Sequence, residues 1–139
     1  MSEFEIDTLA RTLWGEARGE GELGIEAVAC VIANRVAIAE KGRGPRMFGT
    51  GTFESACRFP YQFSCWLPSD PNLEKLKSVT EDDRAFRVCM GIAEIAVSGN
   101  LEDITVSATH YHTKQIKPAW AAGKAPCATI GNHLFYRGV

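Results

Sequence analysis

One stretch near the start of the chain combines a helical apolar pattern with a carboxyl group between two glycines. From residue 6 onward, apolar side chains recur at the spacing i, i+3, i+4, i+7 and i+11, which is one face of an α-helix. These side chains are Ile6, Leu9, Ala10, Leu13 and Ala17. The pattern predicts a helix over residues 5–17 that carries Glu16 at its end, beside Trp14 and between Gly15 and Gly19.

Two interpretations fit this helix end. Glu16 and Glu20 stand four apart, where like charges repel by roughly a few tenths of a kcal/mol, and each neighbouring glycine costs about 1 kcal/mol in a helix interior. In the first interpretation, the helix delivers Glu16 to a cleft, where Trp14 and nearby alanines desolvate the carboxyl group and raise its pKa, as a general acid requires. In the second, the helix end frays, Arg18 pairs with a glutamate, and a glycine caps the helix.

Length and composition narrow the class of protein. A chain of 139 residues favours one domain, residues 1–139, with a core of its own. Its 45% of hydrophobic and 23% of charged residues are typical of soluble globular proteins. The net charge of −2 lacks the basic excess of a nucleic-acid-binding protein, so we expect no nucleic-acid partner. The longest apolar run, residues 27–33, is too short to cross a bilayer, so we expect no membrane insertion.

The N-terminus and the cysteines indicate a protein made in the cytoplasm. Residues 1–5 are acidic and lack the basic and apolar pattern of a signal peptide. Five cysteines, an odd number in a chain without an export signal, argue against a disulfide framework. Cys30 and Cys89 fall in helical apolar patterns and are predicted to be buried. A bridge between Cys57 and Cys65, which flank an aromatic turn, stays open.

The same periodicity predicts two further long helices. One spans residues 23–40, and its apolar face places it in the core. Arg35, near the end of this helix, is interpreted as a surface cation, with a structural ion pair as the alternative. The other helix begins after Thr80, which is interpreted as the N-cap with Asp83 at the reciprocal capping position. Gly99 is predicted to end it.

The residue pattern changes after Gly99. Residues 105–113 are rich in β-branched and aromatic side chains and predict a short strand. Residues 130–136 predict another strand, and the intervening segment contains Pro118, Trp120 and a glycine-containing turn. An antiparallel hairpin beside a helical body is the simplest arrangement of these elements. The predicted fold class is therefore α+β, mainly helical.

Two segments between the long helices have unusual compositions. Residues 41–52 form a basic, glycine-rich loop that lacks the Gly-Lys-Ser/Thr ending of a P-loop. This loop is interpreted as a solvated connection, or as the border of a binding site. Residues 53–67 are dense in aromatic side chains with Gln, Ser and Cys among them. They fit either a turn packed on the core or a wall of a saccharide cleft, because sugars combine apolar ring faces with hydroxyl groups.

Three histidines, His110, His112 and His133, raise the question of a zinc site. His110 and His112 lie two apart on a predicted strand, so they point the same way. The sequence has no His-Glu-x-x-His helix and no Cys-x-x-Cys pair, so we expect no metal and no cofactor. It also has no Gly-x-Ser-x-Gly turn, which argues against a serine nucleophile.

Four ordered blocks of residues resemble a known family. The run from Trp14 to Glu20 is similar to the signature of the SleB-like cell wall hydrolase family, which includes a spore cortex-lytic enzyme and many phage and prophage proteins. The other blocks are Asn34-Arg35-Val36, Gln62-Phe63-Ser64-Cys65-Trp66, and a C-terminal group of His110-Tyr111, Pro118-x-Trp120 and Ile130-Gly131-x-His133-x-Phe135-Tyr136. The resemblance covers nearly the whole chain and favours the interpretation of Glu16 as a catalytic acid.

The resemblance implies a lysozyme-like domain that cleaves the glycan strands of peptidoglycan, and family members of the spore type look like lytic transglycosylases. Glu16 matches the catalytic glutamate of the motif. It would protonate the glycosidic oxygen between N-acetylmuramic acid and N-acetylglucosamine, then take the proton of the muramoyl C6 hydroxyl as that oxygen attacks C1 and closes a 1,6-anhydro ring. Six residues are expected to bind the sugar: Gln62, Ser64, Trp66, His110, Tyr111 and Trp120.

The chain departs from the spore-type pattern, because it shows no signal peptide and no separate peptidoglycan-binding domain. We therefore expect a monomeric phage, prophage or gene-transfer-particle lysin that acts on the cell wall, in the periplasm or outside the cell, and reaches it through a holin or in a particle. Three alternatives stay open. They are a hydrolytic muramidase with Glu20 or Glu22 as its second carboxylate, a zinc amidase, and a non-catalytic wall-binding module.

Overall fold

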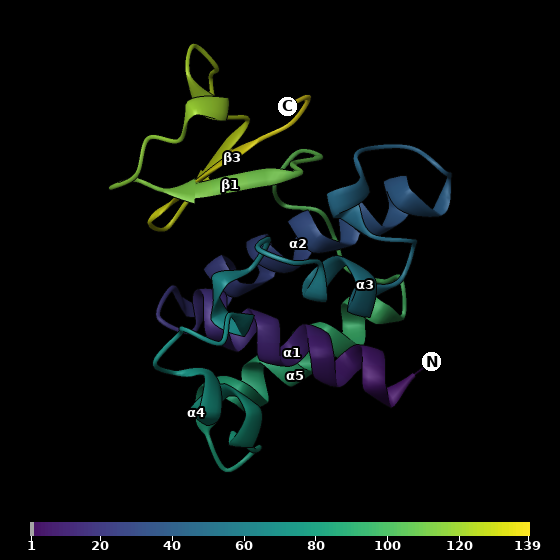
Figure 1. Ribbon diagram of the computed structural model, residues 1–139, viewed down its shortest axis with the longest axis vertical. Helices are drawn as coiled ribbons and strands as arrows, with labels where there is room; N and C mark the ends of the chain where they lie inside the picture. Colours follow the sequence, from purple (N-terminus) through teal and green to yellow (C-terminus); the bar gives the residue numbers. More distant parts are fainter. Residues whose placement is uncertain (1) are drawn as a thin grey trace.

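The computed structural model describes residues 2–139, so Met1, with which the predicted domain begins, lies outside the described residues. The long helices are α1 (Glu3–Ala17), α2 (Gly21–Glu40) and α5 (Arg84–Val97), close to the predicted ranges. The strands gather on one side of this helical body, with α2 between them and the pair formed by α1 and α5 (Figure 1). The fold is α+β and mainly helical, as the sequence predicts.

Short helical segments that the sequence analysis does not predict join these elements. They are α3 (Phe53–Arg58) and α4 (Leu73–Ser78), and the 3₁₀ turns Arg46–Phe48, Ser64–Trp66 and Ala119–Ala121. The carboxylate of Glu5 in α1 accepts hydrogen bonds from the backbone N–H groups of Phe53 and Glu54, each at 2.8 Å. A carboxylate at a helix N-terminus satisfies donors that have no partner within the helix. This contact holds the start of α3 against α1.

The helix α2 is buried on two opposite sides and forms the centre of the core. Val28 and Ile32 pack toward α1 and α5 in the larger apolar cluster. Ala27 and Val31 belong to a second cluster, together with Phe135 of the sheet. A helix that is apolar on more than one side needs cover on each of them. The sheet provides the second cover, and this requirement places it beside α2.

Within the described residues, three strands form one antiparallel sheet in the order β1 (His110–Thr113), β3 (His133–Tyr136) and β2 (Ala128–Ile130). The predicted antiparallel pair is present as β1 and β3. The predicted strand over residues 130–136 is interrupted at Gly131, whose φ of 57° belongs to a turn that glycine adopts easily. This turn folds β2 back along β3, so the sheet has one strand more than the predicted hairpin.

The first predicted strand is shorter than the sequence suggests, because residues 105–107 form a bend before β1. The Asp103 carboxylate accepts hydrogen bonds from the backbone N–H groups of Thr105 at 2.8 Å and Ser107 at 3.0 Å. Val106 and Ser107 have φ values of 61° and 66°, which no strand residue adopts. An aspartate that binds the following backbone thus overrides the strand preference of β-branched residues.

Alternation of side chains along the strands gives the sheet two different faces. The inner face packs toward α2 and carries Tyr111, His133 and Phe135. The outer face carries His110, His112, Leu134 and Tyr136. Trp120 rests on this outer face, with its ring centroid 5.1 Å from that of His110 and 5.2 Å from that of Tyr136. The two predicted neighbours on a strand, His110 and His112, therefore do point the same way.

The predicted N-cap of α5 is wrong. Asp83 caps the helix, because its backbone is extended and its Oδ1 accepts a hydrogen bond from Phe86 N at 2.9 Å. The hydroxyl of Thr80 instead accepts a hydrogen bond from the backbone of Asp82, in a turn that precedes the helix. At the other end, Gly99 has a φ of 82° directly after the helix, as the sequence predicts.

All the cysteines lie in the described part of the chain as free thiols, and Cys57 and Cys65 are not bridged. Cys30 and Cys89 are buried, as predicted from their places in the helical patterns. None of the helices within residues 2–139 combines the length and the apolar character that crossing a bilayer would take.

Gly15 allows α1 to come close to the turn that contains Cys65. A Cβ atom at position 15 would lie 2.5 Å from the Cβ and 2.8 Å from the Sγ of Cys65, which is closer than real atoms pack. Glycine is therefore required here although it weakens the helix. Gly91 in α5 offers the opposite case, because a Cβ atom there would meet no atom within 4 Å.

We expect Gly15→Ala to lower the free energy of unfolding by about 1–3 kcal/mol, because overpacking against Cys65 outweighs the gain in helix propensity. Gly91→Ala is the matched control and should raise it by about 0.5–1 kcal/mol. Urea denaturation followed by circular dichroism measures both changes. A Gly15→Ala variant as stable as the control would contradict the close packing described for position 15.

Candidate active site

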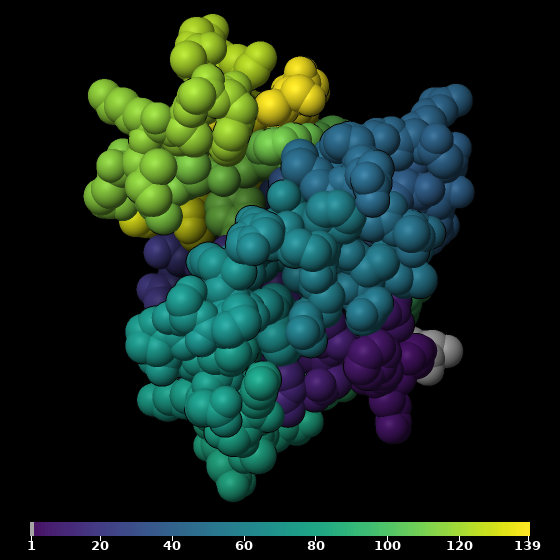
Figure 2. Space-filling view, in the orientation of Figure 1, coloured from purple at the N-terminus to yellow at the C-terminus, as the bar shows by residue number. Residues whose placement is uncertain are grey.

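A cavity of about 600 Å³ opens where the sheet meets the helical body. In Figure 2, the yellow-green C-terminal segments and the blue segment around residue 45 stand on either side of this region. The lining residues are Glu16, Arg35, Pro45, Met47, Tyr61, Gln62, Phe63, His110, Tyr111, Trp120 and Val139. The structure therefore brings the predicted catalytic acid together with four of the six predicted sugar-binding residues.

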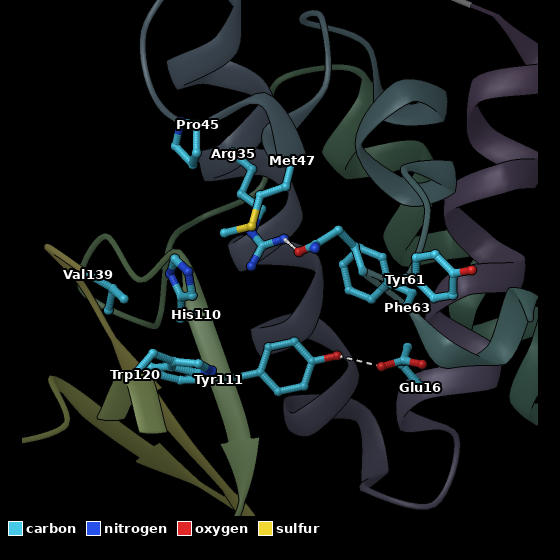
Figure 3. A pocket seen from close by; sticks show the side chains of 11 residues that line it. Glu16, Arg35, Pro45, Met47, Tyr61, Phe63, His110, Tyr111, Trp120 and Val139 are labelled. Carbon is cyan, nitrogen blue, oxygen red and sulfur yellow. Dashed lines mark hydrogen bonds between the residues drawn. The ribbon is translucent and has the colours of Figure 1, made fainter. Parts of the chain in front are cut away.

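Glu16 lies in the last turn of α1, and its carboxyl group meets a tyrosine that reaches across from the sheet (Figure 3). The hydroxyl of Tyr111 donates a hydrogen bond to Glu16 Oε1 at 2.9 Å. Trp14, expected beside the acid, is instead buried in the core, where its Nε1 donates to Asp83 at 3.3 Å. Arg18 donates to the carbonyl oxygen of Trp14 at 3.0 Å and stacks on its ring, rather than pairing with a glutamate.

Burial raises the pKa of Glu16 above its ordinary value. Hydrogen bonds from Tyr111 and Cys65 oppose this effect by stabilising the carboxylate, while the charge of Asp70 adds to it. Burial, together with the neighbouring Glu16 charge, holds the pKa of Tyr111 well above its usual range, so its hydroxyl keeps its proton and donates. The carboxyl group thus retains a proton at higher pH than an exposed glutamate and can serve as a general acid.

Arg35 is buried, so its interpretation as a surface cation is wrong, and among residues 2–139 it takes part in no ion pair either. Its Nε donates to the carbonyl oxygen of Thr109 at 2.8 Å, and its Nη1 donates to Oε1 of Gln62 at 3.1 Å. The guanidinium group also stacks over the rings of Phe48 and Phe63, at 5.0 Å and 5.9 Å from the centroids. Because the sheet and the aromatic segment cover the last turns of α2, this side chain faces the cavity and not the solvent.

Arg35 orients the side chain of one predicted sugar-binding residue and lowers the pKa of another. It takes the amide oxygen of Gln62, which leaves the amide nitrogen of that side chain to donate toward a ligand. Burial, assisted by the charge of Arg35, lowers the pKa of His110 to about 4. His110 is therefore a neutral ring near pH 7, and its Nδ1 shares a hydrogen bond of 3.0 Å with the hydroxyl of Thr109.

Ser64 and Trp66 do not line the cavity that contains Glu16. Trp66 donates from Nε1 to the hydroxyl of Thr12 at 2.9 Å, and Arg58 stacks on its ring with the guanidinium carbon 4.2 Å from the centroid. Trp66 borders a separate, smaller cavity of about 300 Å³. Tyr61 and Phe63 line both this cavity and the one that contains Glu16. Ser64 is exposed at the start of its 3₁₀ turn.

The sequence analysis assigns no binding role to several cavity residues: Arg35, Pro45, Met47, Tyr61, Phe63 and Val139. Two signals pointed toward some of them. The glycine-rich loop contains Pro45 and Met47, and its interpretation as the border of a binding site fits the structure. A cation inside the apolar pattern of α2 was a signal for Arg35, because a charge on a helix that is apolar on two sides has little access to solvent.

Glu20, the candidate second carboxylate, is bound to the sheet and does not line the cavity. Its Oε1 accepts a hydrogen bond from the backbone of Asn132 at 2.9 Å and lies 3.8 Å from Nδ1 of His133. Glu22 is exposed at the start of α2. Within residues 2–139, no three His, Cys, Asp or Glu side chains come together in a group that could hold a metal ion.

The fold and the site define a class of protein: a helical α+β domain with a carboxylic acid at the end of a helix, inside a cavity walled by aromatic and amide side chains. The family model described as Cell Wall Hydrolase matches residues 19–136, so the chain belongs to the cell wall hydrolase family and is an enzyme that acts on peptidoglycan. No curated protein matches the chain.

Two solved structures resemble the chain over nearly its whole length. The catalytic domain of the germination-specific lytic transglycosylase SleB from Bacillus anthracis is 25% identical with a TM-score of 0.72, and the match covers 99% of this chain and 97% of that one. The catalytic domain of the Bacillus cereus SleB protein is also 25% identical with a TM-score of 0.72, with 98% and 91% covered. The structural match thus includes the end of α1, which precedes the residues matched by the family model.

The raised pKa of Glu16 predicts a pH-dependent stability. Because this carboxyl group holds its proton more tightly in the folded protein than in the unfolded chain, the free energy of unfolding falls as the pH rises from below 4.5 through the raised pKa. Glu16→Gln removes this loss and keeps an acceptor for the Tyr111 hydroxyl. We expect the melting temperature of the variant to match that of the wild type at about pH 3 and to exceed it at about pH 8.

Differential scanning calorimetry across this pH range measures the effect. Glu22→Gln, which changes an exposed carboxylate at the start of α2, is the control and should show no gain in melting temperature at high pH. A Glu16→Gln variant with no gain in melting temperature at high pH would contradict the burial of the acid.

Proposed function

We propose that this chain is a lytic transglycosylase that cleaves the bond between N-acetylmuramic acid and N-acetylglucosamine and leaves 1,6-anhydromuramoyl ends. One observation carries the proposal: among residues 2–139, Glu16 is the only acidic side chain that lines the cavity. Ordinary glycoside hydrolysis uses two carboxyl groups, one as the acid and one as the base or nucleophile. An intramolecular attack by a sugar hydroxyl needs one group that acts first as acid and then as base.

The reaction begins with Glu16 protonated, the form that its burial favours. Glu16 transfers this proton to the glycosidic oxygen, the bond from C1 to that oxygen breaks, and N-acetylglucosamine leaves as a free hydroxyl. The resulting carboxylate then accepts the proton of the muramoyl C6 hydroxyl while the C6 oxygen bonds to C1. Glu16 ends the cycle protonated again, and no water molecule is consumed.

The other cavity residues suit a sugar substrate. Gln62, with its amide oxygen held by Arg35, offers an amide nitrogen to hydroxyl or N-acetyl oxygens. The neutral ring of His110 can donate or accept a hydrogen bond. Tyr61 and Trp120 present aromatic surfaces against which apolar sugar faces can stack, and Tyr61 is 82% exposed at the cavity edge.

The SleB structures support the choice of reaction, because one of them is described as a lytic transglycosylase and the likeness extends over the whole chain. A muramidase would require a second carboxylate near the bond, and Glu20 is occupied by the backbone of Asn132. A zinc amidase would require metal ligands, and the described residues contain no group of them.

Peptidoglycan lies outside the cytoplasmic membrane, so the proposal includes action at the wall as a phage, prophage or gene-transfer-particle lysin. The resemblance of four sequence blocks to a family rich in phage proteins supports this role. Expression in the cytoplasm with and without a pore-forming holin tests it. We expect lysis only when the holin is present, and lysis without any pore would overturn this part of the proposal.

Mass spectrometry of digested peptidoglycan tests the reaction itself. We expect muropeptides that are one water molecule lighter than the corresponding reducing-end products. Glu16→Gln should reduce their rate of formation by about 10²–10⁴-fold, since the general acid is lost. Glu20→Gln is the matched control with the same change of group, and we expect it to retain the wild-type rate within about threefold, because its carboxylate lies outside the cavity.

Other products would identify the alternatives. Reducing-end muramic acid would indicate a hydrolase, with Glu20 and Asp70 as the next carboxylates to replace. Free stem peptides would indicate an amidase. Full activity of Glu16→Gln would contradict the assignment of the catalytic acid, and binding to peptidoglycan without any product would indicate a non-catalytic module.

Burial raises the pKa of Glu16, and the hydrogen bond from Tyr111 lowers it by a smaller amount. Tyr111→Phe removes a bond that lowers the pKa of Glu16, so this pKa should rise further. We expect the alkaline limb of the pH profile of kcat/KM to move to higher pH and kcat to fall about tenfold, the effect of about one lost hydrogen bond to a charged group. An alkaline limb that stays in place or moves to lower pH would show that Tyr111 does not act through Glu16.

A further inference from the structure

A second cavity of about 400 Å³ lies between the outer face of the sheet and the loop that covers it. We infer that this cavity binds the stem peptide of the peptidoglycan substrate, an inference that rests on the proposed function. Its floor includes Leu134 and Tyr136 from β3, and its roof includes Ala121 and Ala122. Lys114 and Lys117 stand at its edge and are exposed.

One indole ring connects the lining of the active-site cavity to the lining of the second cavity. Trp120 lines the active-site cavity. Its ring also contacts two residues that line the second cavity: the centroid is 5.6 Å from His112 and 5.2 Å from Tyr136. A glycan strand bound beside Trp120 therefore lies next to the second cavity. The stem peptide branches from the lactyl group of N-acetylmuramic acid, so it leaves the glycan within reach of this cavity.

The positive charge around the second cavity is opposite in sign to the carboxylates of a stem peptide. Residues 104–139 contain four Lys and Arg side chains and no Asp or Glu, although the whole chain has a net charge of −2. Within residues 2–139, neither Lys114 nor Lys117 takes part in an ion pair. A stem peptide carries several carboxylates, and a basic region raises the local concentration of such a ligand.

The shape and polarity of the second cavity also fit this ligand. A stem tetrapeptide contains two alanines, one at each end, with an acidic residue and a diamino acid between them. The floor and roof present small or aliphatic side chains, Ala119, Ala121, Ala122 and Leu134, that suit the methyl groups of these alanines. An apolar floor with two cations at the edge is thus complementary to a chain of alanines and acids.

Hydrogen bonds hold the loop that covers the second cavity in place, which favours binding because little has to be ordered. Lys114 N donates to the carbonyl oxygen of Asn132 at 3.0 Å, and the side-chain amides of Gln115 and Asn132 bind each other twice. These contacts fix the beginning of the covering loop to the turn between β2 and β3. The 3₁₀ turn at Ala119–Ala121 fixes the position of Trp120.

Two substrates test this inference: peptidoglycan with intact stem peptides, and glycan strands from which an amidase has removed them. The measured quantity is the ratio of kcat/KM on the intact substrate to that on the stripped one. We expect the double variant Lys114→Gln, Lys117→Gln to lower this ratio about three- to tenfold through KM. Lys124→Gln removes a charge from the same loop outside the cavity and should keep the wild-type ratio. An unchanged ratio in the double variant would overturn the inference.

Direct binding separates this inference from the proposed function. The probe is a soluble stem tetrapeptide with its carboxylates free, added to isotope-labelled protein and followed by NMR. We expect shifts of Ala121, Ala122 and Leu134 that are weakened in the double variant, and shifts elsewhere or none would overturn the inference. A wild type that cleaves neither substrate but shows these shifts would overturn the proposed function alone. Equal loss of activity on both substrates would show that the cavity binds sugar.

Discussion

A single buried cation holds three parts of the active site together. The guanidinium group of Arg35 joins α2 to the backbone just before β1 through Thr109, and to the aromatic segment through Gln62. Taking a charge out of water is costly, and no carboxylate compensates it here; carbonyl oxygens and the faces of Phe48 and Phe63 do so instead. Because these partners must surround the guanidinium group together, the distance between the walls of the cavity depends on this side chain.

The environment of Glu16, the proposed catalytic acid, depends on a second close approach. Gly15 lets the turn around Cys65 pack against the last turn of α1, and this packing buries Glu16 on the side away from the sheet. Tyr111 covers it from the sheet. Each of these two neighbours affects the pKa of Glu16 in two ways. Its bulk excludes water and raises the pKa, while its hydrogen bond stabilises the carboxylate and lowers the pKa. Burial is the larger effect, so the pKa of Glu16 is raised, and the buried carboxylate lowers the stability of the fold at pH values above that pKa.

Helical periodicity and the family resemblance predicted the long helices, the antiparallel pair of strands and the position of Glu16, because these depend on local spacing. The predictions are wrong where contacts with segments distant in the sequence determine the environment of a side chain. Arg35 was assigned to the surface because its own helix gives no sign that the sheet will cover it. Thr80 and Asp83 are both good caps, and only the bend of the chain before α5 selects between them. Trp66 belongs to a matching sequence block, yet its indole hydrogen-bonds to Thr12 of α1 instead of lining the cavity.

The indole of Trp120 lines the active-site cavity and contacts His112 and Tyr136, which line the second cavity. If a glycan in the first cavity displaces this ring, it also displaces those two side chains, and its binding would then change the affinity of the second cavity for a peptide. Thermodynamic linkage makes such an effect reciprocal: the peptide and the glycan would change each other's affinity by the same factor. The affinity for a glycan strand would then depend on whether its stem peptides are present, through the position of one aromatic ring.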